Sequence, residues 1–217
     1  TLVADFSGDE QAAPAASEPA GQFEPRLSAD AARERIIADS NVLIEPGFNL
    51  HHAQDYYQIP PHIREALGEV KISATNPSQT WPELRSLARM HPRGWERGAT
   101  LDDVSAFFKS SKSKPDLPGT VYVGGPPAGS TTSAMAHEIG HAFDHRVGVR
   151  STRAMGKHHR RLFQRLDTYL SQGGPGGAAG KSEMFAEGFA ELMVDRAAAV
   201  KRFDEEFIKF IEEMIKP

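Results

Sequence analysis

Two histidines and a glutamate in the stretch AMAHEIGHAFDH have the types and spacing to bind and use a metal ion. His137 and His141 lie four residues apart, so on an α-helix their imidazoles share one face about one turn apart. Glu138 lies about 100° round that helix, within reach of a water molecule beside the metal. Zinc lowers the pKa of such a water towards about 7, and a neighbouring carboxylate can act as the general base. The pattern predicts a zinc-dependent hydrolase, although such a pattern also arises by chance in a histidine-rich chain.

The flanking residues indicate that this stretch is a helix of the core. Candidate N-cap residues precede it at 131–133, and Gly148 is placed to end it. Its apolar side consists of Ala134, Ile139, Ala142 and Phe143. Histidines that point inward from such a helix are costly to bury without partners, and a metal ion would satisfy both.

His145 continues the spacing, but it cannot be the third ligand. Three residues on successive turns span about 12 Å of helix axis, which is too far for one zinc ion. We therefore expect His145 to be exposed or to lie beside a ligand. A longer pattern with a third histidine would need glycine at 144 and histidine at 147, where the sequence has Asp144 and Val147.

A downstream segment, KSEMFAEGFAELM, offers carboxylates for the third position. Glu183, Glu187 and Glu191 repeat at helical spacing on an otherwise apolar helix. We predict that Glu183 binds the metal and that Glu187, one turn later, supports a ligating histidine. The alternative is a solvated charged stripe. Asp144 is a further candidate to support His141, with a surface salt bridge as the alternative.

Composition narrows the class of protein. The chain of 217 residues has a net charge of −4 and no cysteine, so His, Asp and Glu are the only strong metal ligands and disulfides are excluded. Lys and Arg are scattered among Asp and Glu and form no basic patch, which argues against nucleic acid as a partner. No apolar run is long enough for a transmembrane segment.

Hydrophobic periodicity and the positions of helix-capping and turn residues predict the helices and strands that must position these residues. Residues 1–27, rich in Ala, Pro, Glu and Ser, predict a flexible N-terminal arm, and 28–217 one domain. Short strands are predicted within 41–48, 69–76 and 120–123, and the capping-box pattern of Thr100 and Asp103 predicts a helix. Further helices are predicted at 28–40, 60–68, 131–147, 152–171 and 182–215, with GGPGGAAG as a flexible connector. Short strands followed by a helical half indicate an α+β fold.

These residues together resemble the family of anthrax lethal factor catalytic domains and bacterial Pro-Pro endopeptidases. The resemblance covers about residues 85–215 and is carried by HEIGHAFDH, FQRLDTYL, SEMFAEGF and, upstream, HPRGWERGATLDDV. It implies a zincin-like metallopeptidase fold, a small sheet with an active-site helix and a helical C-terminal half. It also implies Zn²⁺ bound by His137, His141 and Glu183, with Glu138 as the base. A secreted toxin or effector is implied as well; the alternative location is cytoplasmic.

One position departs from that family. A tyrosine usually lies seven residues before the glutamate ligand and stabilises the oxyanion, but here that position is Gly176. Tyr169 is the nearest substitute, carried on a glycine-rich segment that could close over the site. The alternative is that Tyr169 packs the end of its helix. His158 and His159 are other possible donors, although solvated positions on a helix are the simpler expectation.

The sequence also indicates how a substrate would bind. The strand TVYVGG leads into the metal-binding helix, and an edge strand there can pair with an extended protein or peptide substrate. Tyr122 in this strand is expected in the core. We therefore predict a zinc metalloendopeptidase. The alternatives are a catalytically inactive, zinc-stapled interaction module and a zinc hydrolase that acts on a non-peptide bond; the oligomeric state is not predicted.

Overall fold

The computed structural model describes residues 26–92, 98–110, 119–125 and 131–217. The predicted flexible arm lies outside these residues except for Arg26 and Leu27, so the boundary near residue 27 stays a prediction. Most of the segment HPRGWERG and of the loop after the 120–123 strand also lies outside the described residues.

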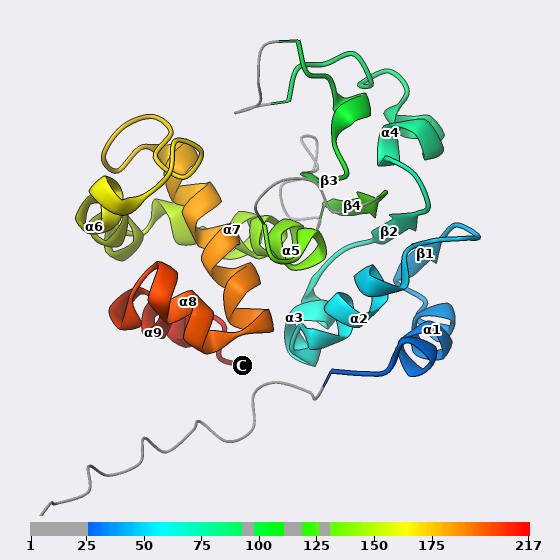
Figure 1. The fold of residues 1–217 in the computed structure, drawn as a ribbon, viewed down its shortest axis with the longest axis horizontal. Helices are drawn as coiled ribbons and strands as arrows, with labels where there is room; N and C mark the ends of the chain where they lie inside the picture. The colour runs from blue at the N-terminus through cyan, green and yellow to red at the C-terminus, as the bar shows by residue number, and fades with distance from the viewer. Residues whose placement is uncertain (1–25, 93–97, 111–118, 126–130) are drawn as a thin grey trace, which may run out of the picture.

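A small mixed sheet forms one side of the fold (Figure 1). The spatial order of its strands is β1 (Val42–Ile44), β2 (Val70–Ser73), β4 (Thr120–Gly124) and β3 (Ala106–Lys109). The first three run parallel, and β3 pairs antiparallel with β4. Because β4 is paired on both sides, the prediction that it forms the edge beside the metal is wrong; β3 occupies that edge.

The helices of the N-terminal half lie beside the sheet (Figure 1). They are α1 (Ala29–Ala38), α2 (Leu50–Gln58), α3 (Pro61–Ala66) and α4 (Pro77–Thr80), with 3₁₀ turns at Pro82–Leu84 and Leu101–Asp103. Ser28 caps α1 as predicted, because its hydroxyl accepts the Ala31 amide proton. The helix α2 was not predicted from the sequence.

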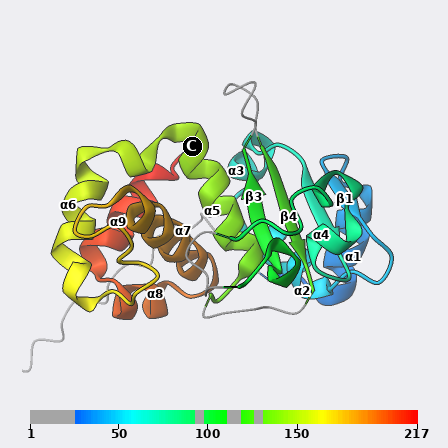
Figure 2. The same ribbon diagram turned by 90° about the horizontal axis from the view of Figure 1, so that it is seen from above.

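The C-terminal half is helical, as predicted, and its first helix, α5, lies between the sheet and the other helices of this half (Figure 2). The five helices are α5 (Ala134–Val147), α6 (Arg153–Leu162), α7 (Ala178–Val194), α8 (Arg196–Arg202) and α9 (Glu205–Met214). Short 3₁₀ turns follow α5 at Val149–Ser151 and α6 at Phe163–Arg165. The architecture is therefore α+β, with a small four-stranded sheet.

Three of the predicted helices differ from the structure. The capping box of Thr100 and Asp103 is present, but it opens only one 3₁₀ turn before the chain enters β3. The predicted 152–171 helix ends at Leu162. The predicted 182–215 helix is three helices, because the carboxylates of Asp195 and Asp204 accept backbone N–H groups and start α8 and α9.

The contact between α5 and α7 sets the geometry of the centre. Phe143 of α5 packs against Phe185 and Phe189 of α7, with ring centroids 6.3 and 6.4 Å apart. One turn away, a Cβ added to Gly140 would lie 2.9 Å from the Cα of Ala186. The missing side chain therefore lets the two backbones approach closely.

Substituting Gly140 tests this approach. Gly140→Ala should force α5 and α7 apart and lower the free energy of unfolding by about 1–3 kcal/mol, as overpacking does. Gly156→Ala on α6 is the matched control: the nearest atom to its added Cβ is the end of the Arg160 side chain, at 3.5 Å. The control should stabilise by about 0.5–1 kcal/mol through helix propensity. Denaturant unfolding measures both, and equal effects would contradict the close approach.

Candidate active site

The two histidines of α5 share one helix face. The N-cap of α5 is Ser133, whose hydroxyl accepts the Ala136 amide proton and donates to Asp55 Oδ2 at 2.8 Å. One turn further, the rings of His137 and His141 lie 4.8 Å apart and nearly perpendicular. The local geometry of a capped helix thus fixes the pair, as its spacing predicted.

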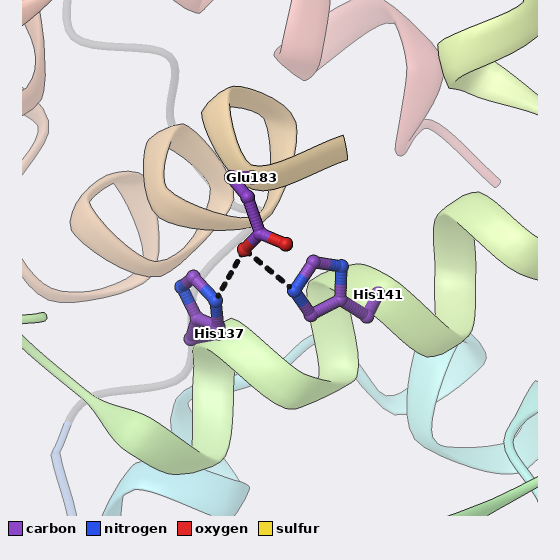
Figure 3. A group of neighbouring side chains, drawn as sticks. All are labelled: His137, His141 and Glu183. Atoms are coloured by element: carbon purple, nitrogen blue, oxygen red, sulfur yellow. Dashed lines mark hydrogen bonds and ion pairs between the residues drawn. The ribbon is translucent and has the colours of Figure 1, made fainter. Parts of the chain in front are cut away.

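Glu183 of α7 meets this pair from the opposite side (Figure 3). Its Oε2 lies 3.4 Å from His137 Nε2 and 3.1 Å from His141 Nε2. One potential ligand atom from each of the three residues lies within 4.8 Å of the others. The structure therefore brings together the three residues that were predicted to bind the metal.

Each histidine has a partner on its other ring nitrogen. His137 Nδ1 lies 2.9 Å from Glu187 Oε2, and His141 Nδ1 lies 3.2 Å from Ser182 Oγ. Because Ser182 donates to Asp144 Oδ2 at 3.3 Å, it must accept the proton of His141 Nδ1. Both rings then turn Nε2 towards Glu183. Ser182 was missed in the sequence because a serine one residue before a glutamate carries no distinguishing pattern.

This donor set fits zinc. Tetrahedral zinc with bonds of about 2.0–2.1 Å places neighbouring ligand atoms about 3.3 Å apart. Two of the three pairs of ligand atoms, the nitrogen to oxygen pairs at 3.4 and 3.1 Å, agree with this distance, and all three atoms lie within 4.8 Å of one another. Ligating histidines normally have their second nitrogen hydrogen-bonded, as both do here. His137, His141 and Glu183 could therefore hold a zinc ion.

The predicted supporting carboxylates are both buried. Glu187 is 2% exposed, and its second oxygen accepts from Arg202 Nη1 at 2.7 Å. The same Arg202 nitrogen reaches Glu191 at 2.5 Å, so Glu191 takes part in an ion-pair network and not in the ligand cluster. Asp144 is fully buried and accepts the backbone N–H of Arg150 at 2.7 Å, which excludes an isolated surface salt bridge.

Electrostatics in the metal-free protein hold a proton on the cluster. Burial would lower the pKa of His137, but its hydrogen bonds to Glu183 and Glu187 outweigh burial and raise the pKa to about 10. Burial would raise the pKa of Glu183, but its hydrogen bonds to His137 and His141 hold that pKa well below its ordinary value. The raised pKa of His137 and the lowered pKa of Glu183 both favour an imidazolium between carboxylates.

Glu138 lies next to the cluster in a cavity of about 400 Å³. Burial raises the pKa of its carboxyl group, while the backbone of Phe108 in β3 provides an opposing hydrogen bond. The cavity is lined by His141 and Glu183 of the cluster, by the edge strand β3 and by further side chains that include Tyr169, His145 and Arg150. A water molecule or a substrate carbonyl in this cavity would be close to Glu138.

Tyr169 also reaches the cluster, from the segment between α6 and α7. Its hydroxyl donates to Glu183 Oε2 at 2.6 Å, and both burial and the Glu183 charge raise the pKa of the phenol. Gly176, at the family's tyrosine position, has φ +80°, a conformation that a tyrosine would adopt only with strain. Tyr169 therefore supplies a hydroxyl at the site, and position 176 does not.

Two other histidines differ from their expected environments. His158 and His159 are not solvated: they are 8% and 0% exposed. His145, expected to be exposed or to lie beside a ligand, is half-buried; its ring lies 5.5 Å from that of Phe108, and its buried Nε2 has no hydrogen-bond partner among the described residues. It borders the cavity and does not contribute to the metal cluster.

Comparisons with known proteins agree with a peptidase fold. The chain is similar to the solved structure of the Pro-Pro endopeptidase of Paenibacillus alvei, with a TM-score of 0.59 and 25% sequence identity. The similarity covers 82% of this chain and all of that one. No family model matches the sequence, and no curated protein matches it. The likeness supports the Pro-Pro endopeptidase side of the sequence resemblance, and the lethal factor side gains no support from it.

The lengths and apolar character of the described helices show whether any of them could span a membrane. In the parts of the chain that the structure describes, no helix has both the length and the apolar character of a membrane span.

Zinc should compete with the proton on His137. At neutral pH this ring is protonated in the metal-free protein, because its pKa is about 10, and Nε2 must lose that proton to bind a metal. The apparent zinc affinity should therefore rise about tenfold per pH unit between about pH 6 and pH 8. Competition with a chelator at several pH values measures the slope, after correction for the chelator's own titration. An affinity independent of pH would contradict a protonated His137.

Proposed function

We propose that this protein is a zinc-dependent metalloendopeptidase with a zincin-like fold. One observation carries the proposal: Nε2 of His137, Nε2 of His141 and Oε2 of Glu183 converge beside a cavity that also contains Glu138. The similarity to a Pro-Pro endopeptidase gives the reaction class. Export from the producing cell and action as a toxin or effector are predictions that rest on the sequence resemblance.

The residues of the chain have separate roles in this proposal. When bound, zinc supplies a Lewis acid that polarises the peptide carbonyl and acidifies water. Glu138 takes a proton from the attacking water at its carboxylate and passes it to the leaving nitrogen, so a C–O bond forms as the C–N bond breaks. Tyr169 donates its hydroxyl proton in a hydrogen bond to the developing oxyanion. Glu187 and the pair of Ser182 and Asp144 orient the two imidazoles.

The number of protein donors at the cluster favours a catalytic metal site over the structural zinc of an interaction module. A structural zinc site holds four protein ligands, whereas three donors converge among the residues that the structure describes. The cluster also borders a cavity with a buried carboxylate and a tyrosine hydroxyl. A purely structural zinc would need neither group.

Substituting the base should separate chemistry from metal binding. Glu138→Gln removes the proton acceptor without changing the ligands, so cleavage should fall by a factor on the order of 10³. Zinc content should stay near one ion per chain, whereas His141→Ala should lose both zinc and cleavage. New peptide termini in a denatured proteome, together with peptides that contain Pro-Pro, provide the assay. Zinc-loaded wild-type protein that produces no new termini would favour the structural module.

We propose that an extended substrate pairs with the free edge of β3, the edge that has no partner strand among the described residues. The Gly124 amide donates to Ser105 O across the ladder, so by alternation the backbone groups of Ala106 and Phe108 point away from β4. Phe108 already contacts Glu138. The free edge therefore runs past the proposed base, where a paired peptide would present its carbonyl.

Proline at the edge tests this binding mode. Ala106→Pro removes an N–H group that faces the free edge without breaking the β3–β4 ladder. KM should rise several-fold, by roughly the worth of one hydrogen bond, with a smaller change in kcat. Lys109→Ala, on the same strand and exposed, is the matched control and should leave KM unchanged. An unchanged KM in Ala106→Pro would argue against pairing at this edge.

A further inference from the structure

A buried histidine outside the metal cluster uses both of its ring nitrogens on one loop. His159 of α6 has no exposed surface. Its Nε2 lies 2.9 Å from the Leu170 carbonyl oxygen, and its Nδ1 accepts the Gly176 amide proton at 2.9 Å. A carbonyl oxygen can only accept, and the Gly176 amide can only donate. These two partners therefore fix a neutral ring with its proton on Nε2.

The two hydrogen bonds close the segment 170–176 into a loop. The first turn of α7 meets the same point, because the Gly180 amide donates to Gln172 O at 3.1 Å. A Cβ on Gly180 would lie 2.5 Å from Leu170 O and 2.6 Å from His159 Nε2. Only glycine fits there without displacing the histidine or the loop.

The residue beside this contact is Tyr169. Its carbonyl oxygen accepts from Gln172 Nε2 at 2.8 Å, and the Leu170 amide donates to Asp167 Oδ1 at 2.9 Å. The backbone of Tyr169 is thus held on both sides, while its hydroxyl reaches Glu183 at 2.6 Å. The direction of the phenol therefore depends on a loop that His159 closes.

We propose that His159 is a positioning residue: it clamps the loop 170–176 to α6 and so holds the Tyr169 hydroxyl at the metal cluster. The catalytic consequence rests on the proposed peptidase function, in which Tyr169 stabilises the oxyanion. The clamp itself is independent of that function.

The charge environment agrees with a neutral clamp. Burial lowers the pKa of His159; the Leu170 hydrogen bond opposes this effect, and the nearby Lys181 and Arg160 add to it. A neutral ring keeps Nδ1 free to accept from Gly176.

The test compares two ways of breaking the clamp with a neighbouring control. His159→Phe keeps an aromatic ring but removes both hydrogen bonds. Gly180→Ala leaves the histidine in place and inserts a Cβ into the contact. His158→Phe is the control, because this adjacent buried histidine contacts Arg161 and Phe210 and not the loop. Each variant is assayed with its zinc content, the hydrogen exchange of amides 170–180, and kcat and KM on a cleaved peptide.

Both clamp variants should retain zinc and exchange the Gly176 amide at least about tenfold faster. Their kcat should fall about 10- to 100-fold, towards that of Tyr169→Phe, with KM within about twofold. The double variant of His159→Phe and Tyr169→Phe should be no slower than Tyr169→Phe alone, because both changes remove the same donor. The control should match wild type in loop exchange.

Two results would overturn the clamp: unchanged loop exchange in both clamp variants, or a double variant that is slower by the full product of the single effects. If wild-type protein cleaves no peptide, the proposed function fails, while the exchange of Gly176 still decides whether His159 holds the loop.

Discussion

The close approach of α5 and α7 is the constraint on which the rest of the structure depends. A metal site of this type needs atoms from two helices within a few ångströms, and here the ligand residues lie more than 40 positions apart in the sequence. Side chains of ordinary size at the crossing would separate the helices and pull Glu183 away from the imidazoles. Gly140 against Ala186 removes that obstacle, and Phe143, stacked on Phe185 and on Phe189, makes the crossing part of the packed core.

Such an arrangement buries charged side chains, and the buried carboxylates of α7 are compensated by hydrogen-bond donors from neighbouring helices. Glu187 lies deep between His137 on one side and Arg202 on the other, so each of its oxygens has a charged or polar donor. Arg202 in turn neutralises Glu191. A buried carboxylate without such partners would be strongly destabilising or would become protonated. The charged side chains of the site therefore come from α5, α7 and α8. The chain changes direction at Asp195, where α8 starts. This change turns Arg202 back towards the carboxylates of α7.

Sequence reasoning succeeded where residue type and helical spacing identify a face, as for His137 and His141 of α5 and Glu183 of α7. It lost accuracy where the result depends on strand pairing or loop packing. The spacing of His137 and His141 already defines a shared face. The start of β3 was predicted as a helix because the capping box at Thr100 exists, yet pairing with β4 overrides it after one turn. Likewise, nothing in the sequence HHRR distinguishes a solvated His159 from one that closes a loop, because its partners Leu170 and Gly176 come from a segment without periodicity.

The location of the tyrosine shows how one site can combine a rigid part with an adjustable one. The side chains that could bind a metal come from two packed helices, whereas the hydroxyl of Tyr169 comes from a loop. At position 176 the backbone has φ +80° and its amide is used by His159, so that position serves loop closure and cannot easily carry a side chain that reaches the cluster. Moving the hydroxyl to position 169 leaves the helices, and with them the ligand geometry, unchanged. The departure from the tyrosine position of the family that the sequence resembles is therefore compatible with an intact cluster of His137, His141 and Glu183, because the two parts of the site depend on different contacts.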